Sequence, residues 1–254
     1  MRASLLLFFA SLILLTGCNR KTEDLSGNDK PSDYFVLQPG KFVTYRLDST
    51  VFPNFGTTTA VRSYQEKHVV DAQIPDALGR PSYRIFRYTR DTAATQAWKP
   101  SGTYFVTPLQ NSVEVIEDNL RSVRLIGAIT ENNTWKGNRY YPDDPYPSYD
   151  FNNDNGNDMT FWDNTYSGVG GSEVVNSKTY TNVVTVDGID ERLNVPVTMP
   201  QSYGTISYFQ EKYARGVGMI FQEFIMWDYQ PPNGSIPNGR KSGFGVKRTI
   251  LDHN

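Results

Sequence analysis

The chain has 254 residues, 38% of them hydrophobic and 20% charged, which is enough apolar side chain for a packed core and excludes a largely disordered protein. Its formal net charge is −2. A near-neutral, slightly acidic chain lacks the basic surface that binds nucleic-acid phosphates, so we expect no DNA or RNA partner.

The N-terminus has the pattern of a secretory signal. The basic Arg2 precedes an apolar run over residues 3–15, which is too short to cross a bilayer as a helix. The run leads into Leu15-Thr16-Gly17-Cys18, which resembles the lipobox of bacterial lipoproteins. That resemblance implies a signal peptide over residues 1–17, cleavage before Cys18, and acylation of Cys18 with attachment to a membrane. Cys18 is the only cysteine, so an intramolecular disulfide is excluded.

The residues after Cys18 bear on the location of the protein. Asn19 is not the Asp that commonly retains lipoproteins in the inner membrane, so the resemblance implies a lipid-anchored outer-membrane protein, on the periplasmic side or at the cell surface. Charged residues 20–24 look like signals for export to the surface, and a solvated tether explains them equally well. Residues 19–33 contain a single Leu, so we expect residues 18–33 to form the acylated Cys and a flexible tether.

Short runs of alternating apolar and polar residues, separated by Gly, Pro, Asn and Asp, predict β-strands from residue 34 to residue 254. In residues 41–48, for example, Val43, Tyr45 and Leu47 share one face. We expect a long, bulged strand over 60–74 that ends at Pro75. Further strands are expected over 82–90 and 102–107 and around 244–250.

Residues 112–127 allow two interpretations. Val113, Ile116, Leu120 and Val123 recur at helical spacing. The same segment can form two strands, with Val113 and Val115 facing inward, a turn at Asp118-Asn119, and Val123 and Leu125 facing inward again. The β interpretation is preferred because the neighbouring segments are β. A clearer hairpin joins residues 206–214 and 219–227 through Arg215-Gly216-Val217-Gly218.

These strands predict an all-β domain over residues 34–254, built as a single antiparallel, strongly curved sheet or half-open barrel, with a β-sandwich as the alternative. Two short signatures carry a family resemblance: Asn119-Leu120-Arg121 leading to Trp135-Lys136-Gly137-Asn138, and residues 211–218. Together they resemble uncharacterised β-rich outer-membrane lipoproteins of Gram-negative bacteria, and the second is similar to hairpins of the curved, half-open barrels of the LolA and LppX kind. This resemblance implies a concave apolar face able to hold a lipid chain, and it assigns no catalytic residue.

The chain has few residues that could support histidine- or cysteine-based catalysis. The two histidines are His68, expected on the surface of a strand, and His253, near the C-terminus. One strand histidine and one terminal histidine do not build a Ser-His-Asp site or a zinc site. Gly168-Val169-Gly170-Gly171 lacks the lysine of a phosphate-binding loop. We therefore assign no catalytic residue.

Residues 138–166 combine aromatic rings with Asp and Asn. Exposed rings beside amides and carboxylates can bind sugars, whereas a segment folded over one end of the barrel would bury the same rings. The candidate ligand-binding residues are Tyr140, Tyr141, Tyr146, Tyr149 and Trp162.

The same segment holds oxygen-bearing side chains at alternate positions. The candidate Ca²⁺ ligands are Asp150, Asn152, Asp154 and Asp158. Their spacing departs from an EF-hand loop, because Gly156 comes one residue late and Phe161 stands where the bidentate Glu would be. A looser Ca²⁺ loop and a solvated turn remain as alternatives, and no other cofactor is expected.

Two functions are consistent with these observations. The first is a membrane-anchored, non-enzymatic envelope lipoprotein that binds an apolar ligand or a glycan. The alternative is an Asp/Glu-dependent, glycosidase-like hydrolase, with or without calcium. A hydrolase requires two carboxylates facing each other across a cleft, about 5–10 Å apart. A binding protein requires a concave apolar face or a platform of rings.

Overall fold

The computed structural model describes residues 29–149, 159–234 and 237–254. Its strands form one twelve-stranded antiparallel sheet in the order β6-β5-β4-β3-β2-β1-β12-β11-β10-β9-β8-β7. The strands are β1 (Phe42–Val51), β2 (Ala60–Pro75), β3 (Pro81–Asp91), β4 (Lys99–Pro108), β5 (Ser112–Glu117), β6 (Leu120–Ile126), β7 (Thr134–Lys136), β8 (Asp163–Val175), β9 (Lys178–Leu193), β10 (Gly204–Ala214), β11 (Gly218–Gln230) and β12 (Arg240–His253). The predicted single curved sheet is confirmed, and the sandwich alternative is wrong.

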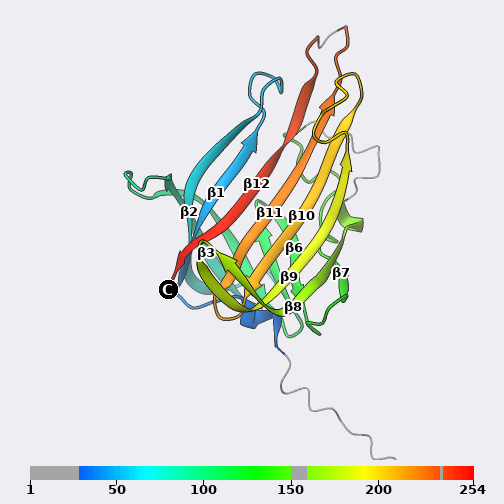
Figure 1. Cartoon of the computed structure of the whole chain (residues 1–254). Coiled ribbons are helices and arrows are strands. Elements are labelled where there is room, and N and C mark those ends of the chain that lie inside the picture. Colours follow the sequence, from blue (N-terminus) through cyan, green and yellow to red (C-terminus); the bar gives the residue numbers. More distant parts are fainter. Residues whose placement is uncertain (1–28, 150–158, 235–236) are drawn as a thin grey trace, which may run out of the picture.

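The sheet curves until it is nearly closed into a barrel, with an unsealed seam between the edge strands β6 and β7 (Figure 1). The amide N of Val123 donates to the carbonyl of Gly137 at 2.7 Å. Trp135 Nε1 donates to the carbonyl of Val123 at 2.8 Å. The hydroxyl of Tyr166 donates to the carbonyl of Ile126 at 2.7 Å and accepts from its amide at 3.0 Å. One backbone hydrogen bond and the side chains of Trp135 and Tyr166 therefore join the two edges where a regular strand ladder is missing.

The segment with two sequence interpretations forms the hairpin of β5 and β6, so the β prediction is confirmed. Val113, Val115, Val123 and Leu125 are buried, as the alternation predicted. The turn places Asp118 at φ 50° and Asn119 at φ 65°, the left-handed conformation that a two-residue hairpin loop needs. The bulge predicted in the long second strand lies between Val70 and Ala72.

A short 3-10 helix, η2 (Pro31–Tyr34), lies at the end of the sheet opposite the tip of the β11–β12 hairpin (Figure 1). Tyr34 is buried among Val123, Tyr166 and Tyr213. Arg215 on the β10–β11 turn pairs with Asp29 at 2.9 Å and lies 3.5 Å from Asp33. Residues 29–33, which composition assigned to the tether, thus pack against the domain. No helix among the described residues has both the length and the apolar character needed to cross a bilayer.

Candidate functional site

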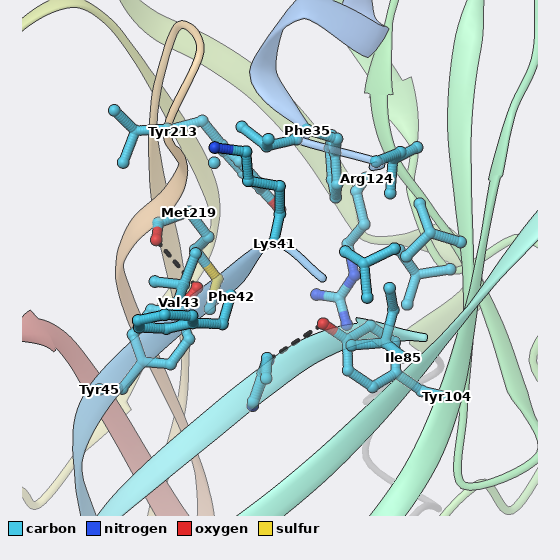
Figure 2. Close-up of a pocket in the computed structure, with 18 of the residues that line it drawn as sticks. Phe35, Lys41, Phe42, Val43, Tyr45, Ile85, Tyr104, Arg124, Tyr213 and Met219 are labelled. Carbon is cyan, nitrogen blue, oxygen red and sulfur yellow. Dashed lines mark hydrogen bonds between the residues drawn. The ribbon is translucent and has the colours of Figure 1, made fainter. Parts of the chain in front are cut away.

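The curved sheet encloses a cavity beside η2, which we call the apolar cavity (Figure 2). Its empty volume is about 790 Å³, including space open to solvent. Aliphatic and aromatic side chains form most of its wall: Phe35, Val36, Leu37, Phe42, Val43, Tyr45, Val70, Ile85, Tyr104, Val106, Val115, Tyr213, Val217 and Met219. Most of them come from β1–β5, β10 and β11, and Phe35, Val36 and Leu37 come from the segment between η2 and β1. A concave, mostly apolar lining with a few polar groups is typical of small-molecule sites.

Charged side chains that are buried or half-buried lie at one side of the apolar cavity. They form a connected set of ion pairs, which we call the charged layer: Arg87, Arg124, Arg248, Glu66, Glu117 and Glu211. These six residues belong to β3, β6, β12, β2, β5 and β10. The layer therefore depends on the curvature of the whole sheet, which brings strands far apart in the sheet order within reach of one another.

Glu211 is the most enclosed member of the charged layer, with a side chain 1% exposed. Its carboxylate accepts hydrogen bonds from Arg124 Nη1 at 2.6 Å, Gln222 Nε2 at 2.6 Å and Tyr213 Oη at 2.7 Å. A buried carboxylate is tolerated when it is paired and hydrogen-bonded in this way.

Glu66 and Glu117 complete the charged layer. Glu66 accepts from Arg248 Nε at 2.7 Å. Glu117 accepts from Arg87 Nη1 at 2.5 Å, whereas Nη2 of Arg124 and Nη2 of Arg248 each stay 3.8 Å from its oxygens. Burial by itself raises the pKa of Glu66 and of Glu117. Neighbouring guanidinium groups, Arg248 first among them, outweigh burial and lower both pKa values. Both side chains are therefore carboxylates at neutral pH.

His68 corrects a sequence-based expectation. It is 8% exposed and faces the cavity, so the prediction of a surface histidine is wrong. Its Nε2 lies 2.9 Å from Glu66 Oε2, and its Nδ1 lies 3.0 Å from the hydroxyl of Tyr104. Burial raises the pKa of the Tyr104 hydroxyl. A neutral imidazole satisfies both contacts, donating from Nε2 to the carboxylate and accepting at Nδ1 from the phenol.

A second cavity shares Glu117, Arg124, Gln222 and Arg248 with the apolar cavity, so these side chains separate the two spaces. Its empty volume is about 770 Å³, again including open space. We call it the aromatic cavity because of the rings in its lining: Tyr141, Tyr146, Trp162, Phe209, Phe224 and Phe244. The ring centroids of Tyr146 and Phe244 are 5.0 Å apart, and those of Trp162 and Phe224 are 6.5 Å apart.

The structure therefore divides the five candidate ligand-binding residues. Tyr141, Tyr146 and Trp162 line the aromatic cavity, whereas Tyr140 and Tyr149 are 49% and 39% exposed. Tyr140 lies beside Arg139, whose guanidinium is 5.0 Å from the ring centroid. The five rings do not form one exposed platform.

The remaining sequence-based candidates lie outside the described residues. These are Cys18 and the candidate calcium ligands Asp150, Asn152, Asp154 and Asp158. Within residues 29–149, 159–234 and 237–254, no group of three or more His, Cys, Asp or Glu is arranged to hold a metal ion.

The charged layer was not predicted from the sequence, although the sequence contains a pattern that indicates it. Glu66, His68 and Val70 follow one another at every second position of β2, as do Glu211 and Tyr213 on β10. Polar residues in phase with the buried apolar face are the available signal. Such a polar residue can be recognised as a buried ion-pair or hydrogen-bond partner only when its partner on another strand is known.

Comparisons with known proteins leave the chain without a family. No protein-family model matches it, and a search of curated protein sequences gives no match. Among solved structures, the chain is similar to one from Vibrio parahaemolyticus that is provisionally described as an outer membrane lipoprotein-sorting protein domain. The identity is 9%, 85% of each chain is covered, and the TM-score is 0.20. A similarity of this size supports no argument about ligand or activity.

Proposed function

We propose that this chain is a non-enzymatic lipoprotein of a Gram-negative envelope, attached to the outer membrane through Cys18, that holds a small apolar or amphipathic molecule in its apolar cavity. The observation that carries the proposal is the lining of that cavity. Val, Ile, Phe and Tyr side chains from many strands line a space of about 790 Å³, part of which is open to solvent. Burying apolar ligand surface there contributes about 25 cal/mol per Å².

The charged layer favours binding over hydrolysis. A glycosidase needs one carboxyl group that keeps its proton near neutral pH, and hence a raised pKa. Arginines lower the pKa values of Glu66 and Glu117. Glu211 is held by three donors, one of them Arg124. These carboxylates are suited to holding the sheet together and to presenting polar groups to a ligand.

The lining also favours an apolar ligand over a glycan. Sugars bind to exposed ring faces flanked by amides and carboxylates. Of the candidate rings, Tyr141, Tyr146 and Trp162 pack against Met159, Met226, Phe224 and Phe244 inside the barrel. The apolar cavity offers aliphatic wall instead. Its position beside η2 also suits membrane attachment, since the eleven residues 18–28 reach at most about 40 Å from Asp29.

Native mass spectrometry tests the proposal directly. Residues 19–254 are purified from the host's own envelope without added ligand, and we expect a co-purifying species with the mass of a lipid-like molecule. A co-purifying sugar mass would support the glycan alternative. A bare protein that also fails to bind a fluorescent acyl probe would refute the proposal.

A cavity-filling variant locates the bound molecule. Met219 lines the apolar cavity, whereas Phe221, two residues further along β11, packs under Lys212 and Lys247 and lines neither cavity. Met219→Trp should abolish acyl-probe binding, and Phe221→Trp should leave it unchanged. Equal binding by both variants would place the ligand elsewhere.

A further inference from the structure

We infer that the ligand of the apolar cavity is an amphiphile with an uncharged, hydrogen-bonding head group, and that this head group contacts Arg124 and Arg248. The inference rests on the proposed function and adds the chemical class of the ligand. It follows from two properties of the charged layer: the donors it leaves for a ligand, and the balance of its charges.

Arg124 and Arg248 both line the apolar cavity and do not use all their donors within the described part of the chain. Arg124 donates from Nη1 to Glu211, and Arg248 donates from Nε to Glu66 and from Nη1 to Gln222. The Nη2 group of each stays 3.8 Å from Glu117, beyond hydrogen-bonding distance. Figure 2 shows the Arg124 guanidinium pointing into the cavity toward Tyr104.

These donors orient the ligand. An aliphatic chain end placed against Nη2 of both arginines would exclude water and offer no acceptor, and burying unpaired donors is unfavourable. The oxygens of a hydroxyl, ester or amide head group at the same place would accept from these donors. The apolar part of the ligand then contacts Val70, Ile85 and Val115 on the cavity wall.

The charges of the layer already balance. Its three arginines face three glutamates, and Arg87 also pairs with Asp118 at 3.2 Å. A carboxylate or phosphate head group would add a buried negative charge that no cation in the layer is left to neutralise. An uncharged acceptor adds none. Selection against anionic head groups therefore comes from the balance of charges in the layer, and Glu117 lies 3.8 Å from Nη2 of both Arg124 and Arg248.

Lys41 offers a second position for the head group of the ligand. It lines the same cavity and belongs to no ion pair among the described residues. An anionic amphiphile could place its head at Lys41 and its chain toward the charged layer. The two arrangements predict opposite preferences between a neutral and an anionic amphiphile with the same chain.

Titration calorimetry with 1-monolauroylglycerol and laurate, both below their aggregation concentrations, separates these arrangements. We expect the wild-type chain, residues 19–254, to bind the neutral probe roughly tenfold tighter or more, because the buried charge of laurate stays uncompensated. Glu117→Gln removes one negative charge and should shift the preference toward laurate. Glu114→Gln makes the same change three residues away on β5, outside both cavities, and should keep the wild-type preference.

Each result of these titrations either supports or overturns the inference. Equal or tighter binding of laurate by the wild type overturns the inference without any variant, and loss of that binding in Lys41→Met would place the head at Lys41. An unchanged preference in a folded E117Q protein also overturns it. If neither probe binds the wild type, the proposed function fails with it, which native mass spectrometry detects independently.

Discussion

Arg124 on β6 and Glu211 on β10 form an ion pair of 2.6 Å across the interior of the barrel, although seven strands lie between them in the sheet order. The hydrogen-bond ladders of the sheet do not connect these two strands. The two side chains can meet only because the sheet curves enough to bring β6 and β10 face to face. It also lies between the two cavities, since Arg124 lines both.

Removing Arg124 should destabilise the protein. Arg124→Met leaves Glu211 buried with two neutral donors, Tyr213 and Gln222, so we expect a loss of about 2–4 kcal/mol in the free energy of unfolding. Urea denaturation measures it. Arg121→Met is the matched control on the same strand. Arg121 is 33% exposed, and its partner Glu114 keeps an ion pair with Arg80 at 3.2 Å, so the change should cost under about 1 kcal/mol.

The double variant R124M/E211M separates charge from packing. Because it leaves neither charge unpaired, it should recover part of the stability that R124M loses. A double variant as unstable as the sum of the two single variants would show that the two side chains do not interact, contrary to the ion pair.

The seam between β6 and β7 depends on the hydroxyl of Tyr166. Tyr166→Phe removes the group that contacts both the amide and the carbonyl of Ile126, so we expect a loss of about 1–3 kcal/mol in unfolding free energy. Tyr180→Phe on β9 is the control, because the Tyr180 hydroxyl is buried and has no hydrogen-bond partner among the described residues. It should be neutral or slightly stabilising. Equal losses in the two variants would show that the seam contact adds no stability.

Sequence periodicity predicted the strands that have one apolar, buried face and one polar face. In residues 112–127 the inward valines and the Asp118-Asn119 turn were enough to locate β5 and β6. The same reasoning missed β7, which has three residues, and β8 and β9. In β8, Gly168, Gly170 and Gly171 interrupt the alternation, and the register shifts at three places against β9.

The charged layer could not be predicted from the pattern of any single strand. On β2, Glu66 and His68 look like surface residues, because isolated polar residues in a strand are usually solvated. They are buried because Arg248 reaches Glu66 from β12 and Tyr104 reaches His68 from β4. Such pairings are properties of the closed sheet. The cavity itself was anticipated only through the family resemblance, which implied a concave apolar face.

Acylation of Cys18 is a separate prediction about the part of the chain that precedes the described domain. Cells given a labelled palmitate analogue should incorporate it into the wild-type protein, and Cys18→Ala should abolish the label and release the protein from the membrane fraction. Asn19→Asp keeps Cys18 and should move the labelled protein to the inner membrane. Labelling that persists in C18A would contradict the lipobox assignment.

The charged layer should also make stability depend on acid. The pKa values of Glu66 and Glu117 are lowered by folding from their ordinary value of 4.5, mainly because Arg248 outweighs burial. A carboxylate with a lowered folded pKa stabilises the protein fully above its unfolded pKa, and this stability is lost as the pH falls toward the folded value. The unfolding free energy should therefore be constant above about pH 6 and fall steadily below about pH 4.5. Glu66→Gln should be less stable at neutral pH and show a shallower acid decline, as urea denaturation across the pH range measures. Parallel curves for E66Q and wild type would mean that Glu66 keeps the same pKa in the folded and unfolded chains, and that its ion pair with Arg248 does not form in solution.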